Sequence, residues 1–355
     1  MNDKGDPARG LIIFILLTIF VKMNTTIAMR SLVFIHRYAY GKTSRRALQL
    51  GRGPCFVRMG RFCKFGLQCL HLMLLPCGVP RRTPLLYASA FRELIIMSSP
   101  LILEIDQALA TVTFNNPARA NVLDLAMAQA FLAAIDKVAS DTSVRALLIT
   151  ANGKQFCAGG DVNAFADPSR PLPQILEELL EPVHAAMAMI SLLKIPVVCA
   201  INGPVGGGGI GLALCGDIVL AAESMKLRGG YSAIGLTPDV GGSWFVTRRA
   251  GAAKAKEIYL TNRAIPSAEC LVCGLVDAVH PDAQLHEAAR TLALQLAKGP
   301  AQAQARIKSL IEVAHHNTLR QHLEAERESM LASGDSDDGK EGIRSFIEKR
   351  APKFN

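Results

Sequence analysis

A run of four glycines is the stretch of this sequence that could do chemistry through its main chain. Residues 206–209 lie between an apolar, strand-like segment at 195–201 and an apolar segment with helical character at 210–214. A strand, a glycine loop and a helix start leave backbone N–H groups unpaired and pointing outward. Glycine also lets a ligand approach the main chain closely. The stretch therefore predicts a site for negative charge: a phosphate, a carboxylate or an oxyanion that forms during a reaction.

The residues around the glycines exclude two common phosphate-binding motifs. A P-loop needs Gly-Lys-Ser or Gly-Lys-Thr, whereas Ile210 follows Gly209. The Gly207-x-Gly209 spacing also lacks the rest of a dinucleotide fingerprint and its acidic ribose-binding residue. The nine cysteines include one Cys-x-x-Cys, Cys270 and Cys273, without a second pair nearby, so we expect no metal site.

Strand-like and helix-like segments alternate along the chain from residue 101. Residues 101–105 and 109–114 are typical of a hairpin, and residues 123–140 have the apolar spacing of a helix that Asp124 caps or starts. The turn at 238–242 opens another helix. Further strands are expected at 144–150, 217–222 and 226–228, and further helices at 175–193, 253–260, 267–274, 282–298, 301–315 and 318–333. The order predicts an α/β protein followed by a helical C-terminal part, with a solvated loop around Asp335, Asp337 and Asp338 before the last helix.

Positive charge is concentrated in the first part of the chain. Residues 1–96 carry a net charge of +12 and the remainder −3, so the overall +9 does not indicate nucleic-acid binding by the body of the protein. Residues 11–21 are apolar, too short for an ordinary membrane span but typical of the apolar region of a signal sequence. Two interpretations stay open: a targeting or membrane-associating extension, or a natural start at Met97. We favour the second because organised sequence follows Met97 directly.

Several spaced motifs after residue 100 together resemble the crotonase superfamily, the enoyl-CoA hydratase/isomerase family. Each motif is short, but their order and spacing agree along roughly 100–355. The motifs are Asn116-Pro117 with NVL at 121–123, FCAGGD at 156–161, Asn202-Gly203 with the glycine run and Gly216-Asp217, IGLTP at 234–238, LTNR at 260–263 with Ala268-Glu269, GLV at 274–276, and the tail from EGI at 341–343 to KRAPKF at 349–354.

The resemblance implies an α/β fold of the crotonase type, a spiral of ββα repeats, with acyl-CoA thioesters as substrates. Residues 97–290 would form the core with the acyl-CoA site, and residues 291–355 a helical C-terminal region used for trimerisation. We expect a homotrimer or a dimer of trimers, with no nucleic-acid or membrane partner for the core. Coenzyme A is part of the substrate, so no separate cofactor is expected.

In the family, two backbone N–H groups hold the thioester oxygen. The matching positions here are Gly160 and Gly208, with Ala158 and Gly207 beside them as substrate-binding residues. A thioester enolate concentrates negative charge on one oxygen, and two preorganised donors in a dry pocket lower that barrier. This expectation agrees with the interpretation of the glycine run as an anion site. A tight turn is the alternative role of Gly160.

The acid and base residues distinguish the reactions of the family. Its hydratases carry two glutamates at the positions of Gly211 and Tyr231, so hydration is not favoured here, and Tyr231 is expected to bind substrate. Isomerases that shift a double bond into conjugation, and the ring-epoxide/oxepin-CoA isomerases of phenylacetate breakdown, keep one acid in the turn where Asp239 stands. One carboxylate suffices to remove the α-proton and return it to the γ-carbon, and apolar neighbours would raise its pKa. The alternative is that Asp239 only caps the following helix.

His184 keeps a second chemistry open. Aromatic acyl-CoA dehalogenases of the family use an aspartate nucleophile at the position of Asp239 and a histidine base twelve residues before a strand proline. His184 lies twelve residues before Pro196. The tryptophan that those enzymes use is matched by Tyr231, however, and His184 also fits an ordinary packed helix residue.

Arg119 and Lys353 match positions that contact CoA phosphates, with ordinary surface charge as the alternative for both. Two further functions stay open: a hydratase in which Asp239 alone activates water, and a non-catalytic relative that binds RNA or a membrane through residues 1–96. Buried free thiols fit a reducing compartment, so a cytoplasmic location is expected. The sequence leaves open whether the acyl group is fatty or aromatic.

Overall fold

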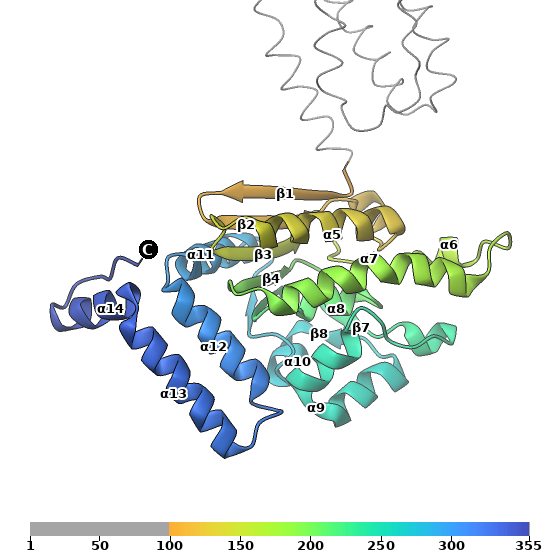
Figure 1. Ribbon diagram of the computed structural model, residues 1–355. Coiled ribbons are helices and arrows are strands. Elements are labelled where there is room, and N and C mark those ends of the chain that lie inside the picture. Colours follow the sequence, from red (N-terminus) through yellow and green to blue (C-terminus); the bar gives the residue numbers. More distant parts are fainter. Residues whose placement is uncertain (1–98, 355) are drawn as a thin grey trace, which may run out of the picture. The chain divides into compact units, whose positions relative to one another are not determined.

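The computed structural model of the chain describes residues 99–354 (Figure 1). The apolar segment 11–21 and the basic extension 1–96 lie outside the described residues. The described part contains two β-sheets with helices packed on them, followed by C-terminal helices, which confirms the predicted α/β class. No helix in this part is both long and apolar enough to cross a membrane.

The larger sheet has six strands in the order β1-β2-β3-β4-β6-β9. β1 and β2 form the predicted antiparallel hairpin, and every other neighbouring pair is parallel. All side chains of β3 and β4 are buried, as expected for parallel strands that are covered on both faces. The strands are β1 Leu101–Asp106, β2 Leu109–Phe114, β3 Ala146–Ala151, β4 Val197–Ile201, β6 Ile218–Ala222 and β9 Ala278–His280.

Two long helices pack on one side of this sheet. α5 (Leu125–Ser140) begins, as predicted, after Asp124, whose side chain accepts a hydrogen bond from the backbone N–H of Met127. α7 (Leu172–Leu192) packs against α5 and buries Val183 and Ile190 in the same apolar core. α7 contains Pro182, which has no N–H to donate within the helix, but the helix continues to Leu192 with its apolar face in the core.

The opposite face of the sheet is covered by α11 (Leu285–Ala297). Its buried residues pack against side chains of β3, β4 and β6 that point away from α5 and α7. The expected boundary between residues 290 and 291 therefore falls inside α11, a helix that packs against the sheet. The change to the C-terminal helices comes after Ala297, because the apolar spacing of α11 serves the core up to that residue.

A smaller sheet and several short helices carry the loops of interest. This sheet has the order β5-β7-β8. α9 has non-helical dihedral angles at Gly251, so it is two helical segments joined by a kink. The elements are β5 Val205–Gly206, β7 Lys226–Arg228, β8 Ile265–Pro266, the 3-10 helices η1 Pro117–Arg119 and η2 Tyr231–Ile234, α6 Val162–Phe165, α8 Gly209–Leu214, α9 Gly242–Thr261 and α10 Ser267–Val272.

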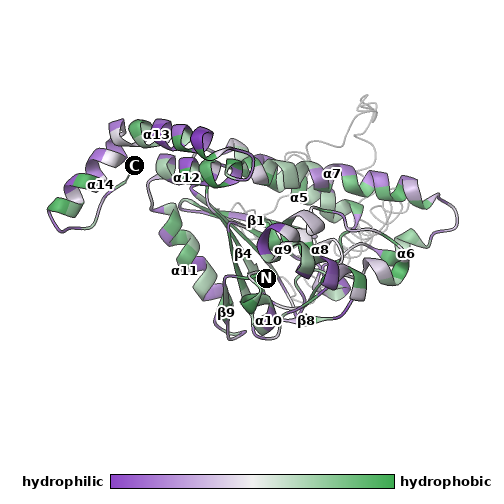
Figure 2. Ribbon diagram, turned by 90° about the horizontal axis from the view of Figure 1, so that it is seen from below, coloured by the Kyte–Doolittle hydropathy of each residue, from purple (hydrophilic) through white to green (hydrophobic). Residues whose placement is uncertain are grey.

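Three helices follow the core: α12 (Ala301–Val313), α13 (Leu319–Asp335) and α14 (Asp337–Ile347). Figure 2 shows green apolar stretches along these helices, and α12 and α13 bury none of their residues. The predicted solvated loop at 335–338 is wrong. Asp337 and Asp338 lie in the first turn of α14, because the hydroxyl of Ser336 accepts a hydrogen bond from the Gly339 N–H and starts the helix. Two carboxylates suit that helix end.

Candidate active site

The two loops that carry the expected oxyanion-hole residues lie side by side. The backbone N–H of Gly206 donates to the carbonyl oxygen of Cys157 at 3.0 Å, and Cys157 also forms a parallel bridge with Val205. This pairing brings residues 157–160 alongside residues 205–208, although they are almost fifty positions apart. The predicted partners Gly160 and Gly208 thus belong to two adjoining stretches of backbone.

The backbone N–H groups of Gly160 and Gly208 have no hydrogen-bond partner among the described residues. The ring of Phe165 covers Gly160 so closely that a Cβ there would lie 2.7 Å from the ring. Unpaired donors beside an aromatic wall can stabilise a developing oxyanion better than donors in water. The oxyanion-hole role of both residues stays a prediction.

Asp239 lies against this glycine loop. A Cβ on Gly208 would be 3.1 Å from Oδ1 of Asp239, so a side chain there would make the carboxylate shift by a few tenths of an ångström. The hydroxyl of Tyr231 donates a hydrogen bond to the same Oδ1. The helix-cap interpretation of Asp239 is wrong: α9 begins at Gly242, its N-terminal cap is Gly241, and no side chain caps it. Asp239 is instead part of the cluster around the glycines.

Burial sets the ionisation of these two groups. It raises the pKa of Asp239 above its ordinary value, while the hydrogen bond from Tyr231 acts in the opposite direction. Burial and the nearby carboxylate raise the pKa of Tyr231 as well. The phenol therefore stays protonated as a donor, and the carboxylate is a stronger base than one in water.

The structure explains why Gly211 carries no side chain. A Cβ at this position would overlap the carbonyl oxygen of Val240. A glutamate, which the family hydratases have here, cannot fit while the Asp239–Val240 turn keeps this position. Because Tyr231 fills the place of the second glutamate, Asp239 is the carboxylate that the described residues bring to the glycine loop.

Two further residues near Asp239 are His184, which has a contact that the sequence did not predict, and Cys157, which has a buried thiol. His184 is exposed on α7, but its Nε2 accepts a hydrogen bond from the backbone N–H of Val240 at 3.2 Å. No local pattern relates these positions, which are 56 residues apart. Cys157 is buried in the first loop, and burial raises the pKa of its thiol to about 11. The thiol is therefore protonated at neutral pH and is a poor nucleophile.

The remaining expected site residues do not all belong to the two adjoining loops. Ala158 and Gly207 stand on the two adjoining loops, next to the amides of Gly160 and Gly208. Arg119 lies near them but pairs with two carboxylates, Asp124 at 3.0 Å and Asp161 at 2.5 Å. Its contact with a CoA phosphate stays a prediction, and its ion pairs give it a second role in holding the loop that follows Gly160.

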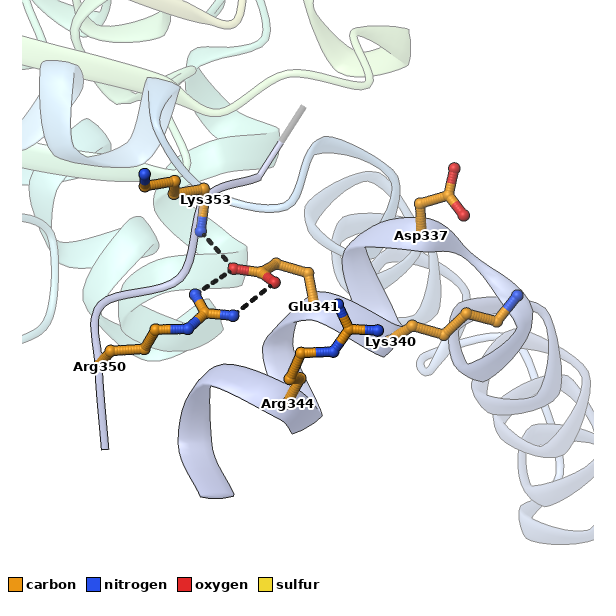
Figure 3. A pocket seen from close by; sticks show the side chains of 6 residues that line it. All are labelled: Asp337, Lys340, Glu341, Arg344, Arg350 and Lys353. Atoms are coloured by element: carbon orange, nitrogen blue, oxygen red, sulfur yellow. Dashed lines mark hydrogen bonds and ion pairs between the residues drawn. The ribbon is translucent and has the colours of Figure 1, made fainter. Parts of the chain in front are cut away.

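Lys353 is not brought to this site. It lines a pocket of about 540 Å³ at the C-terminus (Figure 3), where its backbone N–H and the guanidinium of Arg350 both bind the carboxylate of Glu341. In both Figure 1 and Figure 2, α14 lies far from α8. The pocket is lined by Asp337, Lys340, Glu341, Arg344, Arg350 and Lys353.

Comparisons with known proteins agree with the motifs. The family model described as enoyl-CoA hydratase/isomerase matches residues 104–355. The 1,2-epoxyphenylacetyl-CoA isomerase of Escherichia coli K12 is 34% identical over 255 residues, which are 72% of this chain and 97% of that protein. A probable enoyl-CoA hydratase of Rhodobacter capsulatus is 34% identical over 251 residues, 71% of this chain and 96% of that protein.

Solved structures show the same similarity. The crystal structure of an enoyl-CoA hydratase from Polaromonas sp. JS666 has a TM-score of 0.68 and 31% identity. It covers 72% of this chain and 99% of its own. The relatives thus include proteins named as isomerases and proteins named as hydratases. The choice between these reactions therefore depends on the chemistry of the site.

Proposed function

This chain belongs to the enoyl-CoA hydratase/isomerase family of the crotonase superfamily, and we propose that within this family it is an acyl-CoA isomerase that shifts a double bond. The expected crotonase fold is confirmed by the solved relatives. Members of the family act on acyl-CoA thioesters, and the chain is an enzyme of this family. The single observation that carries the proposal is one partly buried carboxylate, Asp239, held against the glycine loop.

The proposed reaction needs one base and one anion site. The thioester oxygen accepts hydrogen bonds from the N–H groups of Gly160 and Gly208, and Asp239 removes the α-proton. The electron pair of that C–H bond moves into an enolate, whose charge the two donors stabilise. The same carboxyl group returns the proton to the γ-carbon, so the double bond moves into conjugation and the mass is unchanged. Oδ2 of Asp239 is the proposed proton acceptor, because Oδ1 accepts the hydrogen bond of Tyr231.

The two family glutamate positions argue against hydration by the usual two-carboxylate route. Gly211 has no space for a side chain, and Tyr231 is engaged with Asp239. Water activated by Asp239 alone is the second candidate, since one carboxylate can also act as a general base. A dehalogenase has less support, because the Nε2 lone pair of His184 is engaged by Val240 N–H and is not free to act as a base.

Measuring the conjugated enoyl thioester separates these functions. Purified protein would be incubated with a 3-enoyl-CoA and, separately, with a 2-enoyl-CoA, while absorbance is followed and the products are weighed by mass spectrometry. The proposal expects rising absorbance from the 3-enoyl substrate at unchanged mass. Falling absorbance from the 2-enoyl substrate with the gain of one water, and no change in the 3-enoyl substrate, would show a hydratase instead.

We also propose that the C-terminal helices join copies of this chain into a homotrimer or a dimer of trimers. Large apolar side chains on α12–α14 are exposed in one copy, including Ile311, Leu323 and Phe346, the last at 85%. Exposed apolar patches of this extent usually mark an interface. In this proposal, Ala158, Gly207 and Arg119 bind the CoA part of a substrate in the site of their own copy. Lys353 would contact only a substrate in a site that the assembly brings near it.

A further inference from the structure

We propose that His184 is a positioning residue: it accepts a hydrogen bond from the backbone N–H of Val240 and thereby holds the turn that carries Asp239. The inference rests on the proposed role of Asp239 as the base. His184 itself would not touch the substrate or move a proton.

The turn needs support because its backbone is strained. Val240 has a φ of 51°, and Gly241 follows with 74°. A β-branched residue in this left-handed region is an outlier that persists only where the surroundings over-determine it. Val240 is also fully buried, so its N–H must find a partner inside the protein. The partner that it finds is Nε2 of His184, at 3.2 Å.

His184 lies on α7, two residues after Pro182, which is inside the helix. It follows Val183, which is fully buried, and α7 packs against α5 through the apolar core. A hydrogen-bond acceptor on such a helix fixes the position of the Val240 amide more firmly than one on a loop. The contact joins two segments that are 56 residues apart, and it lies one residue from the carboxylate.

Other contacts fix the remaining sides of the turn. A Cβ on Gly208 would lie 3.1 Å from Cγ2 of Val240, and the carbonyl oxygen of Val240 lies over Gly211. The carbonyl oxygen of Asp239 accepts from the Gly242 N–H at 2.8 Å. Within this set, His184 can be changed without altering the proposed base or the glycine loop, so its contribution can be measured separately.

The geometry also assigns the state of the imidazole. An Nε2 that accepts a hydrogen bond carries no proton, so the neutral ring has its proton on Nδ1. A protonated ring would have two donors and could not accept from Val240. The positioning role therefore needs an acceptor at the Nε2 position, and a glutamine side chain places an amide oxygen near that point.

The test compares His184→Leu, which has no acceptor, with His184→Gln, which has one. We expect His184→Leu to lower kcat about 10- to 100-fold, the effect of leaving one buried donor unpaired, with little change in KM. His184→Gln should keep most of the activity. His286→Leu, at an exposed position on α11, is the matched control and should not change kcat.

A second measurement does not depend on catalysis. Amide hydrogen exchange around residues 239–242 should be faster in His184→Leu than in the wild type and should be close to wild type in His184→Gln. If Asp239→Asn remains active, the proposed function fails, while the exchange result still tests the hydrogen bond from Val240 to His184. Wild-type kcat and exchange in His184→Leu would overturn the inference, as would a His184→Gln variant as inactive as His184→Leu.

If His184→Leu does not fold, a measurement on the wild-type protein tests the inference. ¹⁵N chemical shifts of its labelled histidines distinguish the two neutral tautomers. A His184 ring with its proton on Nδ1 supports the inference, and a ring with its proton on Nε2 contradicts it.

Discussion

The hydroxyl of Tyr231 makes two hydrogen bonds to one residue: it donates to Oδ1 of Asp239 and accepts from the backbone N–H of Asp239 at 3.3 Å. The phenol thus holds both the side chain and the main chain of the carboxylate residue. Since Tyr231 lies in the short helix η2, eight residues before Asp239, the connection is local in sequence. This hydrogen bond engages Oδ1 and leaves Oδ2 as the proton acceptor of the proposed mechanism.

Replacing Tyr231 by phenylalanine should move the acid limb of the activity profile to higher pH. Burial raises the pKa of Asp239, and the hydrogen bond from Tyr231 opposes that rise. In the proposed mechanism Asp239 acts only as the carboxylate, so kcat is lost as the pH falls through this pKa. Without the phenol hydroxyl the pKa rises further, and the loss begins at higher pH. The measurement is kcat against pH for both proteins; an acid limb that stays in place would show that Tyr231 does not act on Asp239.

Asp239→Asn should abolish most of the isomerisation. A general base contributes about 10²- to 10⁴-fold in rate, and the amide cannot accept the α-proton. The expected result is a loss of kcat in this range, with the dissociation constant for CoA measured by calorimetry nearly unchanged. An Asp239→Asn variant with wild-type turnover would remove Asp239 from the mechanism.

The stability of Asp239→Asn should depend on pH differently from that of the wild type. Measuring it also shows whether the variant folds. The pKa of Asp239 is raised in the folded state, so folding favours its protonated form, and this stabilisation is lost as the pH rises through the raised pKa. Asparagine has no charge to bury. The unfolding midpoint of Asp239→Asn relative to the wild type should therefore increase as the pH rises above about 4, the ordinary pKa of an aspartate, towards the raised pKa. A difference that does not vary with pH would contradict the raised pKa.

Gly211→Ala should destabilise the protein and remove activity. The new methyl group would overlap the carbonyl oxygen of Val240 and push the Asp239 turn away from the glycine loop. Overpacking of this kind costs about 1–3 kcal/mol, measured by denaturant unfolding. Gly334→Ala is the matched control, since that glycine also lies in a helix but has open space around its Cβ position. The control should gain about 0.5–1 kcal/mol; equal behaviour of the two variants would refute the steric argument.

Phe346→Glu should reduce the size of the assembly. This side chain is 85% exposed on α14 and lies beside Ile343 and Ile347, which are also exposed. A charge at the centre of an apolar interface is costly unless it is paired. Light scattering after size-exclusion chromatography should show a trimer or hexamer for the wild type and a mass near 38.1 kDa for the variant. Val272→Glu, at a similarly exposed site on α10, should keep the wild-type mass; a wild-type protein that is monomeric would sink the proposal.

The sequence determined the parts of the site that depend on short stretches of chain. Apolar periodicity indicated the hairpin, α5 with its cap at Asp124, and the strand before the glycine run, because these features follow from residues a few positions apart. The glycines indicated an anion site because their lack of a side chain is itself the property that such a site needs. The motifs in order along the chain indicated the family, and residue matching indicated Asp239 as the acid in the turn.

The tertiary structure decided how these parts act together. Only the packing of α8 against the turn shows that Gly211 excludes a side chain and that Asp239 approaches Gly208. The hydrogen bond from Val240 to His184 joins residues 56 positions apart, and no local preference of either residue specifies it. The left-handed conformation of Val240 is even opposed by the preference of a β-branched residue, so it exists only because surrounding contacts enforce it. Sequence patterns record local preferences, whereas the ionisation and position of a base depend on which distant groups the completed fold brings to it.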